Sequence, residues 1–398
     1  MPITKFPLKT SHLSLYLEES KGIVYHKISH NLYHLPTLSI AILFSIDEGQ
    51  NQQSIINSIA KEYQLSKQLL EPIYHQINTL FSSPKQQGTY LAGRYPEFEA
   101  SPKQVKLINH IQVAYFQVAD TIFSIDTKDE DLFIAIQALL SPCRCSSIKV
   151  DFVISIAISD DNYQIFSNGL LVETDLSFNH VMPLIIDRLQ ILSFQKSDYT
   201  FCFHGAALGT PRGTLLLPGK SGSGKSTLSA VLAGVDGGLF SDEIIAFNKN
   251  FELCLLSLPI AVKSGSWKSL DIQYPNLKHM PTWHRLDGRR LKYVWPNDKQ
   301  ANKTISKNDN AKFLLINPKF VTQPSNAQEA QPQAVAKPLD VIDTIAMLTD
   351  SGYQLGFELT ESGFEAFLNF IEKTPCYQLS YSSSQQALDK LDELWLLQ

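Results

Sequence analysis

The sequence predicts a mixed α/β and α+β protein in which a domain built around a glycine-rich loop follows a small winged-helix-like domain. One observation is an apolar strand, a glycine-rich loop and an amphipathic helix that follow one another between residues 213 and 234. The other is a strand region followed by three helical patterns within the first 82 residues. A length of 398 residues indicates more than one domain, and we expect domains at 1–90, 100–200 and 201–398.

Composition excludes several classes of protein. The chain has 34 Lys and Arg against 39 Asp and Glu, and this net charge of −5 argues against a nucleic-acid partner. Apolar runs are far shorter than the roughly 20 residues of a membrane-spanning helix, and the N-terminus lacks the apolar core of a secretory signal. Five cysteines do not make a disulfide framework. We expect a soluble, cytoplasmic protein without a membrane partner, and a homo-oligomer is compatible with the sequence.

The first 82 residues predict a small module. β-branched and aromatic residues around a Ser-Lys-Gly turn indicate a strand pair within residues 13–35. Three helical patterns follow, at 37–48, at 52–63 and from Ser66 to about residue 80. Pro72 lies inside the third pattern and predicts that this helix begins one turn later. Strands followed by three short helices are typical of a winged-helix-like module.

The remaining patterns divide the chain further. Residues 84–100 form a polar connection rich in Pro and Gly, where we expect a domain boundary. Residues 105–200 are mostly strand-like, with a helix from about 179 to 193, and indicate a mixed α+β layer. Residues 318–338 are rich in Gln, Ala and Pro and predict a loop or disordered segment. The patterns beyond predict helices at 339–350 and 361–373, a strand at 377–383 and a helix at 385–397.

The glycine-rich loop carries the strongest chemical signal. It follows the apolar strand 213–218 and fits the pattern G-x-x-x-x-G-K-[ST]. Glycines let backbone N–H groups converge on an anion, and the helix N-terminus adds partial positive charge. Lys225 is expected to reach the β- and γ-phosphates of ATP, and the Ser226 hydroxyl to ligate Mg²⁺. The expected nucleotide-binding residues are Gly219, Lys220, Ser221, Gly222, Ser223, Gly224, Lys225, Ser226 and Thr227.

An acidic pair and a histidine flank this loop in the sequence. Asp242 and Glu243 precede the apolar run 244–247, so a short helix and a turn would return them to the phosphates. Two adjacent acids can divide the work: Asp242 holds Mg²⁺, and Glu243 accepts a proton from an attacking hydroxyl. His204 ends the apolar strand 199–203 and is either a group near the transferred phosphoryl or a buried structural histidine. The expected catalytic residues are therefore Lys225, Asp242, Glu243 and His204.

These residues together resemble the HPr kinase/phosphorylase superfamily, which by fold includes the ATP-type phosphoenolpyruvate carboxykinases. The resemblance rests on His204-Gly205, the loop 218–229 and Phe-Ser-Asp-Glu at 240–243, and it extends to 259–267 and 374–381. It implies a kinase fold, with His204 near the phosphate, Lys225 and Ser226 on nucleotide and Mg²⁺, and the acidic pair as metal ligand and base. The family has Glu where this chain has Thr227 and Asp where it has Glu243, and its glycine-rich basic signature is missing. HPr itself is therefore not the expected substrate.

The N-terminal pattern from residue 23 to residue 81 resembles a RiPP recognition element, the fold of the peptide chaperone of pyrroloquinoline-quinone biosynthesis. The resemblance implies that a leader peptide binds by strand addition, in a groove between residues 22–28 and 66–80. A DNA-binding winged helix is the rival, but the third helix carries Lys67 as its one cation. A structural or dimerisation domain stays open.

The sequence thus predicts an ATP- and Mg²⁺-dependent kinase that phosphorylates a hydroxyl, Ser or Thr, of a ribosomally made precursor peptide. Lys263 follows the apolar stretch 255–262 and is the expected substrate-site cation, ahead of Lys268, Arg285, Arg289 and Arg290. The alternatives are a small-molecule kinase with a structural first module, and a nucleotide-gated peptide-binding protein without transfer.

Overall fold

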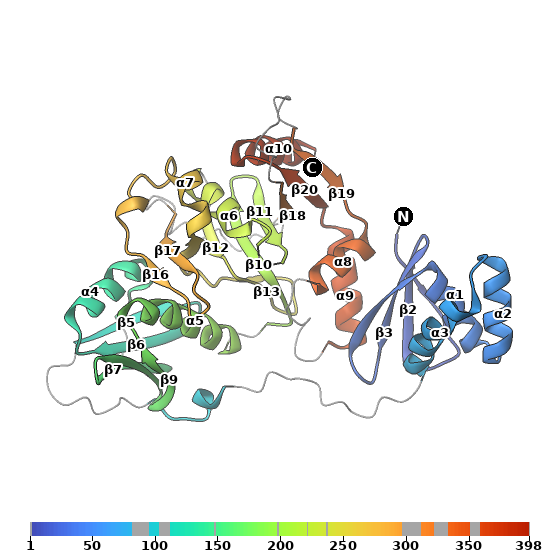
Figure 1. Ribbon diagram of the computed structural model, residues 1–398, viewed down its shortest axis with the longest axis horizontal. Helices are drawn as coiled ribbons and strands as arrows, with labels where there is room; N and C mark the ends of the chain where they lie inside the picture. Colours follow the sequence, from blue (N-terminus) through green and yellow to red (C-terminus); the bar gives the residue numbers. More distant parts are fainter. Residues whose placement is uncertain are drawn as a thin grey trace. The chain divides into compact units, whose positions relative to one another are not determined.

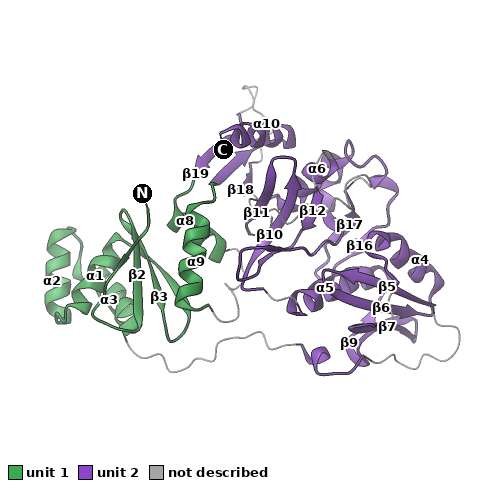
Figure 2. Ribbon diagram, turned by 180° about the vertical axis from the view of Figure 1, so that it is seen from behind, with its two compact units in different colours: residues 1–92, 338–349, 355–376 green, residues 93–337, 350–354, 377–398 purple. Residues whose placement is uncertain are grey.

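The computed structural model describes residues 2–81, 95–102, 112–146, 149–196, 199–220, 222–235, 238–296, 312–321, 333–350 and 359–397. The protein is mixed α/β, with several sheets, one of which combines parallel and antiparallel strands. It divides into two compact units (Figure 2). The first holds residues 1–92, 338–349 and 355–376, and the second holds 93–337, 350–354 and 377–398. Two segments from the C-terminal part of the chain therefore belong to the N-terminal unit.

The first unit is built on an antiparallel sheet. Its described strands follow the order β1 (Thr4–Phe6), β2 (Leu13–Glu18), β3 (Lys21–His26) and β4 (Asn31–Pro36). Its helices are α1 (Thr37–Asp47), α2 (Gln52–Glu62), α3 (Lys67–Phe81), α8 (Val341–Thr349) and α9 (Glu361–Glu372). The sheet lies between α1–α3 on one side and α8–α9 on the other (Figure 1).

Burial along β2 follows from this position. Leu13 and Leu15 pack into the core that α1, α2 and α3 share with the sheet. Tyr16, on the opposite face, meets the ring of Phe364 of α9 edge-on at 5.2 Å. Because β2 has apolar neighbours on both faces, it is buried along almost its whole length and lacks the alternation of a half-exposed strand. The sheet is therefore an inner layer of the unit.

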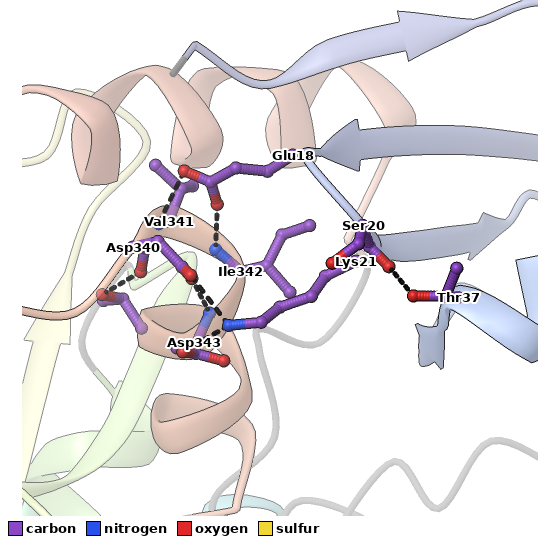
Figure 3. Close-up of polar contacts among 9 residues, drawn as sticks. Glu18, Ser20, Lys21, Thr37, Asp340, Val341, Ile342 and Asp343 are labelled. Atoms are coloured by element: carbon purple, nitrogen blue, oxygen red, sulfur yellow. Dashed lines mark hydrogen bonds and ion pairs between the residues drawn. The ribbon is translucent and has the colours of Figure 1, made fainter.

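The turn between β2 and β3 also fixes the start of α8 (Figure 3). The Glu18 carboxylate accepts hydrogen bonds from the backbone N–H groups of Val341, at 3.2 Å, and Ile342, at 2.8 Å. Lys21 Nζ contacts the carboxylates of Asp340, at 2.8 Å, and Asp343, at 2.5 Å. A carboxylate at a helix N-terminus satisfies N–H groups that lack a partner in the helix and interacts favourably with the helix dipole.

The three N-terminal helices confirm the patterns predicted for them, with two corrections nearby. α3 begins at Lys67 and keeps Pro72 inside it, so the predicted later start is wrong. The strand region holds β2, β3 and β4, with β1 added, instead of a single pair. β3 pairs with β2 on one edge and β4 on the other, so residues 22–26 have no free edge for strand addition. Among the described strands of this sheet, the outer edges belong to β1 and β4.

The second unit contains three further sheets. The five-stranded sheet, in the described part of the chain, has β5 (Gln112–Val118), β6 (Thr121–Thr127), β7 (Phe152–Ser159), β8 (Asn162–Ser167) and β9 (Leu170–Leu176). The helices α4 (Glu130–Leu139) and α5 (Phe178–Lys196) share its core. Strands and helices thus alternate in the described part of residues 105–200, as predicted, while 105–111, 147–148 and 197–198 lie outside the described residues. The small sheet β15–β17–β16 consists of β15 (Ile260–Lys263), β16 (Trp283–His284) and β17 (Arg290–Val294).

The largest sheet carries the glycine-rich loop. Its described strands run in the order β14–β13–β10–β11–β18–β20–β19, and β12 also pairs with β10. Their bounds are β10 (Phe201–Thr210), β11 (Gly213–Pro218), β12 (Gly238–Ser241), β13 (Ile244–Phe247), β14 (Leu253–Cys254), β18 (Phe313–Phe320), β19 (Val335–Pro338) and β20 (Cys376–Tyr381). Helices α6 (Lys225–Val235), α7 (Trp267–Leu270) and α10 (Ser384–Leu396) complete the unit. The segment predicted as a loop at 318–338 thus contains the end of β18 and all of β19, while 322–332 lie outside the described residues.

Two hydrophobic cores meet along β10. Cys202 belongs to the core that includes the five-stranded sheet and α5, whereas Ala206 and Leu208 belong to the core around α6 and β11. His204 and Gly205 lie between them, where β10 passes from one core to the other. No helix in the described part of the chain is long and apolar enough to cross a membrane.

Candidate functional site

The glycine-rich loop joins β11 to α6 as the sequence predicts. Gly222 and Gly224 have φ of +88° and +94°, a region that favours glycine. Apart from its chain neighbours, no heavy atom of the described residues lies within 4 Å of the place where a Cβ of Gly222 would stand. Lys225, 7% exposed, donates from Nζ to the carbonyl oxygens of Gly219, at 2.6 Å, and Lys220, at 2.8 Å. Ser221 lies outside the described residues. The loop offers an open, glycine-lined turn with a lysine folded against it.

Burial lowers the pKa of Lys225 to about 8, and the positive charge of Lys263 adds to this effect. The carboxylates of Glu243 and Asp242 oppose it. A buried ammonium group is stabilised by a negatively charged ligand, because the opposite charge compensates for the solvation that burial removes. The electrostatics of the loop therefore favour an anion.

Strand β10 connects the loop to the acidic pair. Gly205 pairs with Pro218 of β11, and the N–H of Gly219 donates to the carbonyl oxygen of His204 at 3.2 Å. On the other edge of β10, the N–H of Gly205 donates to the carbonyl oxygen of Glu243 at 3.1 Å. A Cβ at Gly205 would lie 2.7 Å from the carbonyl oxygen of Leu217. Only glycine allows this close approach, which explains the dipeptide His204-Gly205.

The acidic pair joins β12 to β13. Asp242 Oδ1 is buried and has no hydrogen-bond partner among the residues that the structure describes. Burial and the charge of Glu243 together raise the pKa of Asp242 to about 8, against the opposing effects of Ser226 and Lys225. A buried carboxylate oxygen without a donor is unfavourable unless a cation accompanies it. Asp242 and Ser226 therefore fit the expected pair of Mg²⁺ ligands.

A cation at this place would take its other ligands from outside the protein. Among the described residues, no group of three or more His, Cys, Asp or Glu side chains could hold a metal ion. Mg²⁺ commonly binds through one or two protein oxygens together with waters and substrate phosphates. Such a cation suits an anionic ligand on the neighbouring loop.

His204 and Glu243 stand side by side. His204 Nδ1 lies 3.4 Å from Glu243 Oε1, with the two side chains 12% and 49% exposed. Burial and the charges of Lys225 and Lys263 together lower the pKa of His204 to about 4, so the imidazole is neutral at pH 7. Partial burial raises the pKa of Glu243, while Lys225 and Arg285 oppose this. A neutral imidazole and a carboxylate are both groups that can take a proton from a reacting hydroxyl. β10 continues to Thr210, so the prediction that the strand ends at His204 is wrong.

Lys263 is the last residue of β15, and its charge acts on His204, Lys225 and Glu243. The structure thus brings the predicted substrate-site cation to the same place, although the strand begins at Ile260 rather than Leu255. Thr227, at the start of α6, makes a 2.6 Å hydroxyl contact with Ser266. This contact ties α6 to the segment that follows β15. The nucleotide-binding role of Thr227 stays a prediction.

A cleft with several polar side chains borders the acidic pair. The sequence predicted only some of the residues that line it. Asp187 and Gln190 of α5 line it, together with Glu243, Arg285 and Tyr293. Arg285 pairs with Asp187 at 3.1 Å. Arg285 was one of several cations that the sequence could not rank, and Asp187 was missed. The signal for Asp187 is an acid that directly follows the apolar run 181–186 in a helical pattern.

Asn317 was also missed. β18 runs parallel to β11, and a Cβ at Gly219 would lie 3.2 Å from Asn317 Oδ1. The side chain therefore stands where the loop begins. A polar residue directly after the apolar run Leu314–Ile316 is the pattern that would have indicated it.

Comparison with known proteins assigns no function to this site. No protein-family model matches the chain, and no curated protein matches it.

Proposed function

We propose that the protein is an ATP- and Mg²⁺-dependent kinase related to the HPr kinases, and that it phosphorylates a Ser or Thr hydroxyl of a precursor peptide. One observation carries the proposal. β10 lies between the glycine-rich loop and the acidic pair, so Gly219 and Glu243 each exchange a backbone hydrogen bond with residues 204–205. An anion-binding loop, a buried acid and two proton acceptors in one place are the groups that phosphoryl transfer to a hydroxyl needs.

Each residue has a definite task in this proposal. The N–H groups of the loop and Lys225 bind and orient the phosphates of ATP. Ser226 and Asp242 hold Mg²⁺, which when bound neutralises charge on the phosphate oxygens. Glu243 or His204 takes the proton from the acceptor hydroxyl. Lys263 supplies positive charge beside the oxygens of the transferred group.

A peptide as the substrate is supported by the first unit, whose sheet has two described edge strands. Among the described strands, β1 and β4 each pair on one side, so either could receive an added strand. The leader would then bind on the first unit and the reacting hydroxyl on the second. The cytoplasmic location expected from the sequence belongs to this proposal.

A small-molecule kinase is the second candidate, and two observations favour it. The cleft beside Glu243 is lined by charged and polar groups such as Asp187, Gln190 and Arg285, which suits a small polar acceptor. The first unit also contains α8 and α9 from the C-terminal part of the chain, which is expected if this unit has a structural role and does not capture a peptide. A peptide-binding protein without transfer is the third candidate.

One assay separates the three. The full chain is incubated with Mg²⁺, γ-labelled ATP and either a library of Ser- and Thr-containing peptides or free serine and threonine. Label on peptides supports the proposal, and label on free amino acids alone supports the second candidate. ATP binding with no transfer to any acceptor supports the third. No ATP binding at all contradicts the proposed function.

A further inference from the structure

An exposed phenylalanine lies beside the glycine-rich loop. Phe320, the last residue of β18, is 49% exposed. Its Cβ is 3.5 Å from the place where a Cβ of Gly224 would stand. Burying half of a phenylalanine and leaving the other half in water forgoes part of its hydrophobic stabilisation. An exposed ring beside a candidate phosphate site therefore calls for an explanation.

The ring of Phe320 packs against Tyr381 of the neighbouring strand β20. Tyr381 of β20, 5% exposed, meets it edge-on, with the ring centres 5.7 Å apart and the planes at 74°. The N–H of Val321 donates to the carbonyl oxygen of Tyr381 at 2.9 Å, which fastens the end of β18 to β20. Tyr381 is also close to the loop, because its hydroxyl lies 2.9 Å from the Cβ position of Gly224. The buried Tyr381 thus lies next to both Gly224 of the loop and Phe320.

We propose that the outward face of Phe320 stacks on the base of a nucleoside triphosphate whose phosphates are bound by the glycine-rich loop. This inference rests on the proposed function and adds the subsite for the base. A flat aromatic ring recognises a base by its π face, and stacking of this kind tolerates any base. The site therefore takes purine nucleotides with little distinction between adenine and guanine. It binds them more tightly than inorganic tripolyphosphate, which has no base.

The test compares ligands with and without a base on the full-length protein. Binding of ATP, GTP and tripolyphosphate, each with Mg²⁺, is measured by calorimetry for the wild type, Phe320→Ala and Phe320→Trp. Loss of one stacked ring corresponds to roughly a 10- to 100-fold loss of affinity. We expect this loss for ATP and GTP with Phe320→Ala, an unchanged tripolyphosphate affinity, and near wild-type binding with Phe320→Trp.

Ile272→Ala is the matched control. Ile272 is 87% exposed, and its neighbour Gln273 contacts Gly234 near the far end of α6 from the loop. All three ligands should bind this variant as they bind the wild type. Phe320→Leu serves if the alanine variant does not fold, because leucine keeps apolar contact with Tyr381 but has no π face.

The outcomes are distinct. An equal loss of ATP and tripolyphosphate affinity in Phe320→Ala would show that the ring only supports the loop, which overturns the inference. Unchanged ATP affinity in Phe320→Ala or Phe320→Leu overturns it too, and leaves the proposed function standing. If the wild type binds neither ATP nor tripolyphosphate, the proposed function fails, and this inference fails with it.

Discussion

The carboxylate of Glu18 caps helix α8 by accepting a hydrogen bond of 2.8 Å from the N–H of Ile342, a residue 324 positions later in the chain. Glu18 is 5% exposed, so solvent screens this contact little. The turn of the N-terminal sheet and a helix from the C-terminal part of the chain therefore depend on one another for stability (Figure 3).

Glu18→Ala should lower the free energy of unfolding of the full chain by about 1–2 kcal/mol, because two N–H groups of α8 lose their charged acceptor. Chemical denaturation of the variant measures the effect. Glu71→Gln, an exposed change in α3, is the control and should stay within about 0.5 kcal/mol of the wild type. A Glu18→Ala protein as stable as that control would show that water replaces the cap.

Removal of residues 1–90 should yield a chain that aggregates. Ile342 and Ile345 of α8 and Phe364 and Phe367 of α9 are at most 3% exposed in the intact protein. Deletion of the sheet would expose these faces to water. Light scattering and size-exclusion chromatography would measure this, and coexpression of residues 1–92 should restore solubility. A soluble, monomeric truncated chain would contradict the prediction.

Lys225→Ala should reduce phosphoryl transfer by at least about 100-fold and weaken ATP binding, because the bound phosphates lose their main cation. The same change leaves two loop carbonyls without their donor, so a loss of about 1–2 kcal/mol in stability should accompany it. Lys249→Ala, in the exposed turn after β13, is the control and should retain transfer. Near-normal transfer by Lys225→Ala would mean that the loop is not the reacting site.

Glu243→Gln and His204→Asn should separate the two candidate bases. The variant that lacks the base should keep ATP affinity and lose roughly 10²- to 10⁴-fold in transfer rate. The other variant should lose much less. Asp242→Asn should instead raise the Mg²⁺ concentration needed for half-maximal transfer. Rates and Mg²⁺ titrations on all three variants decide the assignment, and equal, small effects of Glu243→Gln and His204→Asn would place the base elsewhere.

The first unit should lose stability in acid through Glu361. Burial opposes ionisation of this carboxyl, but hydrogen bonds from Lys5, Ser14 and Lys27 outweigh it and lower its pKa from 4.5 to about 2. Between pH 4.5 and pH 2 the unfolded chain takes up a proton that the folded chain does not bind, so stability falls as the pH falls. Glu361→Gln should remove this part of the pH dependence. Urea denaturation at several pH values checks it, and equal slopes in wild type and variant would contradict it.

The local parts of the site could be predicted from the sequence. The loop requires glycine where φ is positive, and the order of strand, loop and helix is visible within about 20 residues. Asp187 and Asn317 could not be predicted in the same way, because strand pairing and helix packing bring them to the loop and cleft from distant segments. The membership of α8 and α9 in the first unit was missed for the same reason. Their amphipathic patterns predicted helices but did not identify the sheet they cover.

The interleaving of the two units has a consequence for synthesis on the ribosome. The strands of the N-terminal sheet emerge first, but the tyrosine-bearing face of that sheet is covered only when α9, ending at Glu372, has left the exit tunnel. At about 5–20 residues per second, translation of the intervening chain takes on the order of tens of seconds. During that interval Tyr16 and Tyr25 lack their partner Phe364. The nascent chain then exposes an apolar sheet face that chaperones can bind, and the first unit completes its fold only after α9 has been made.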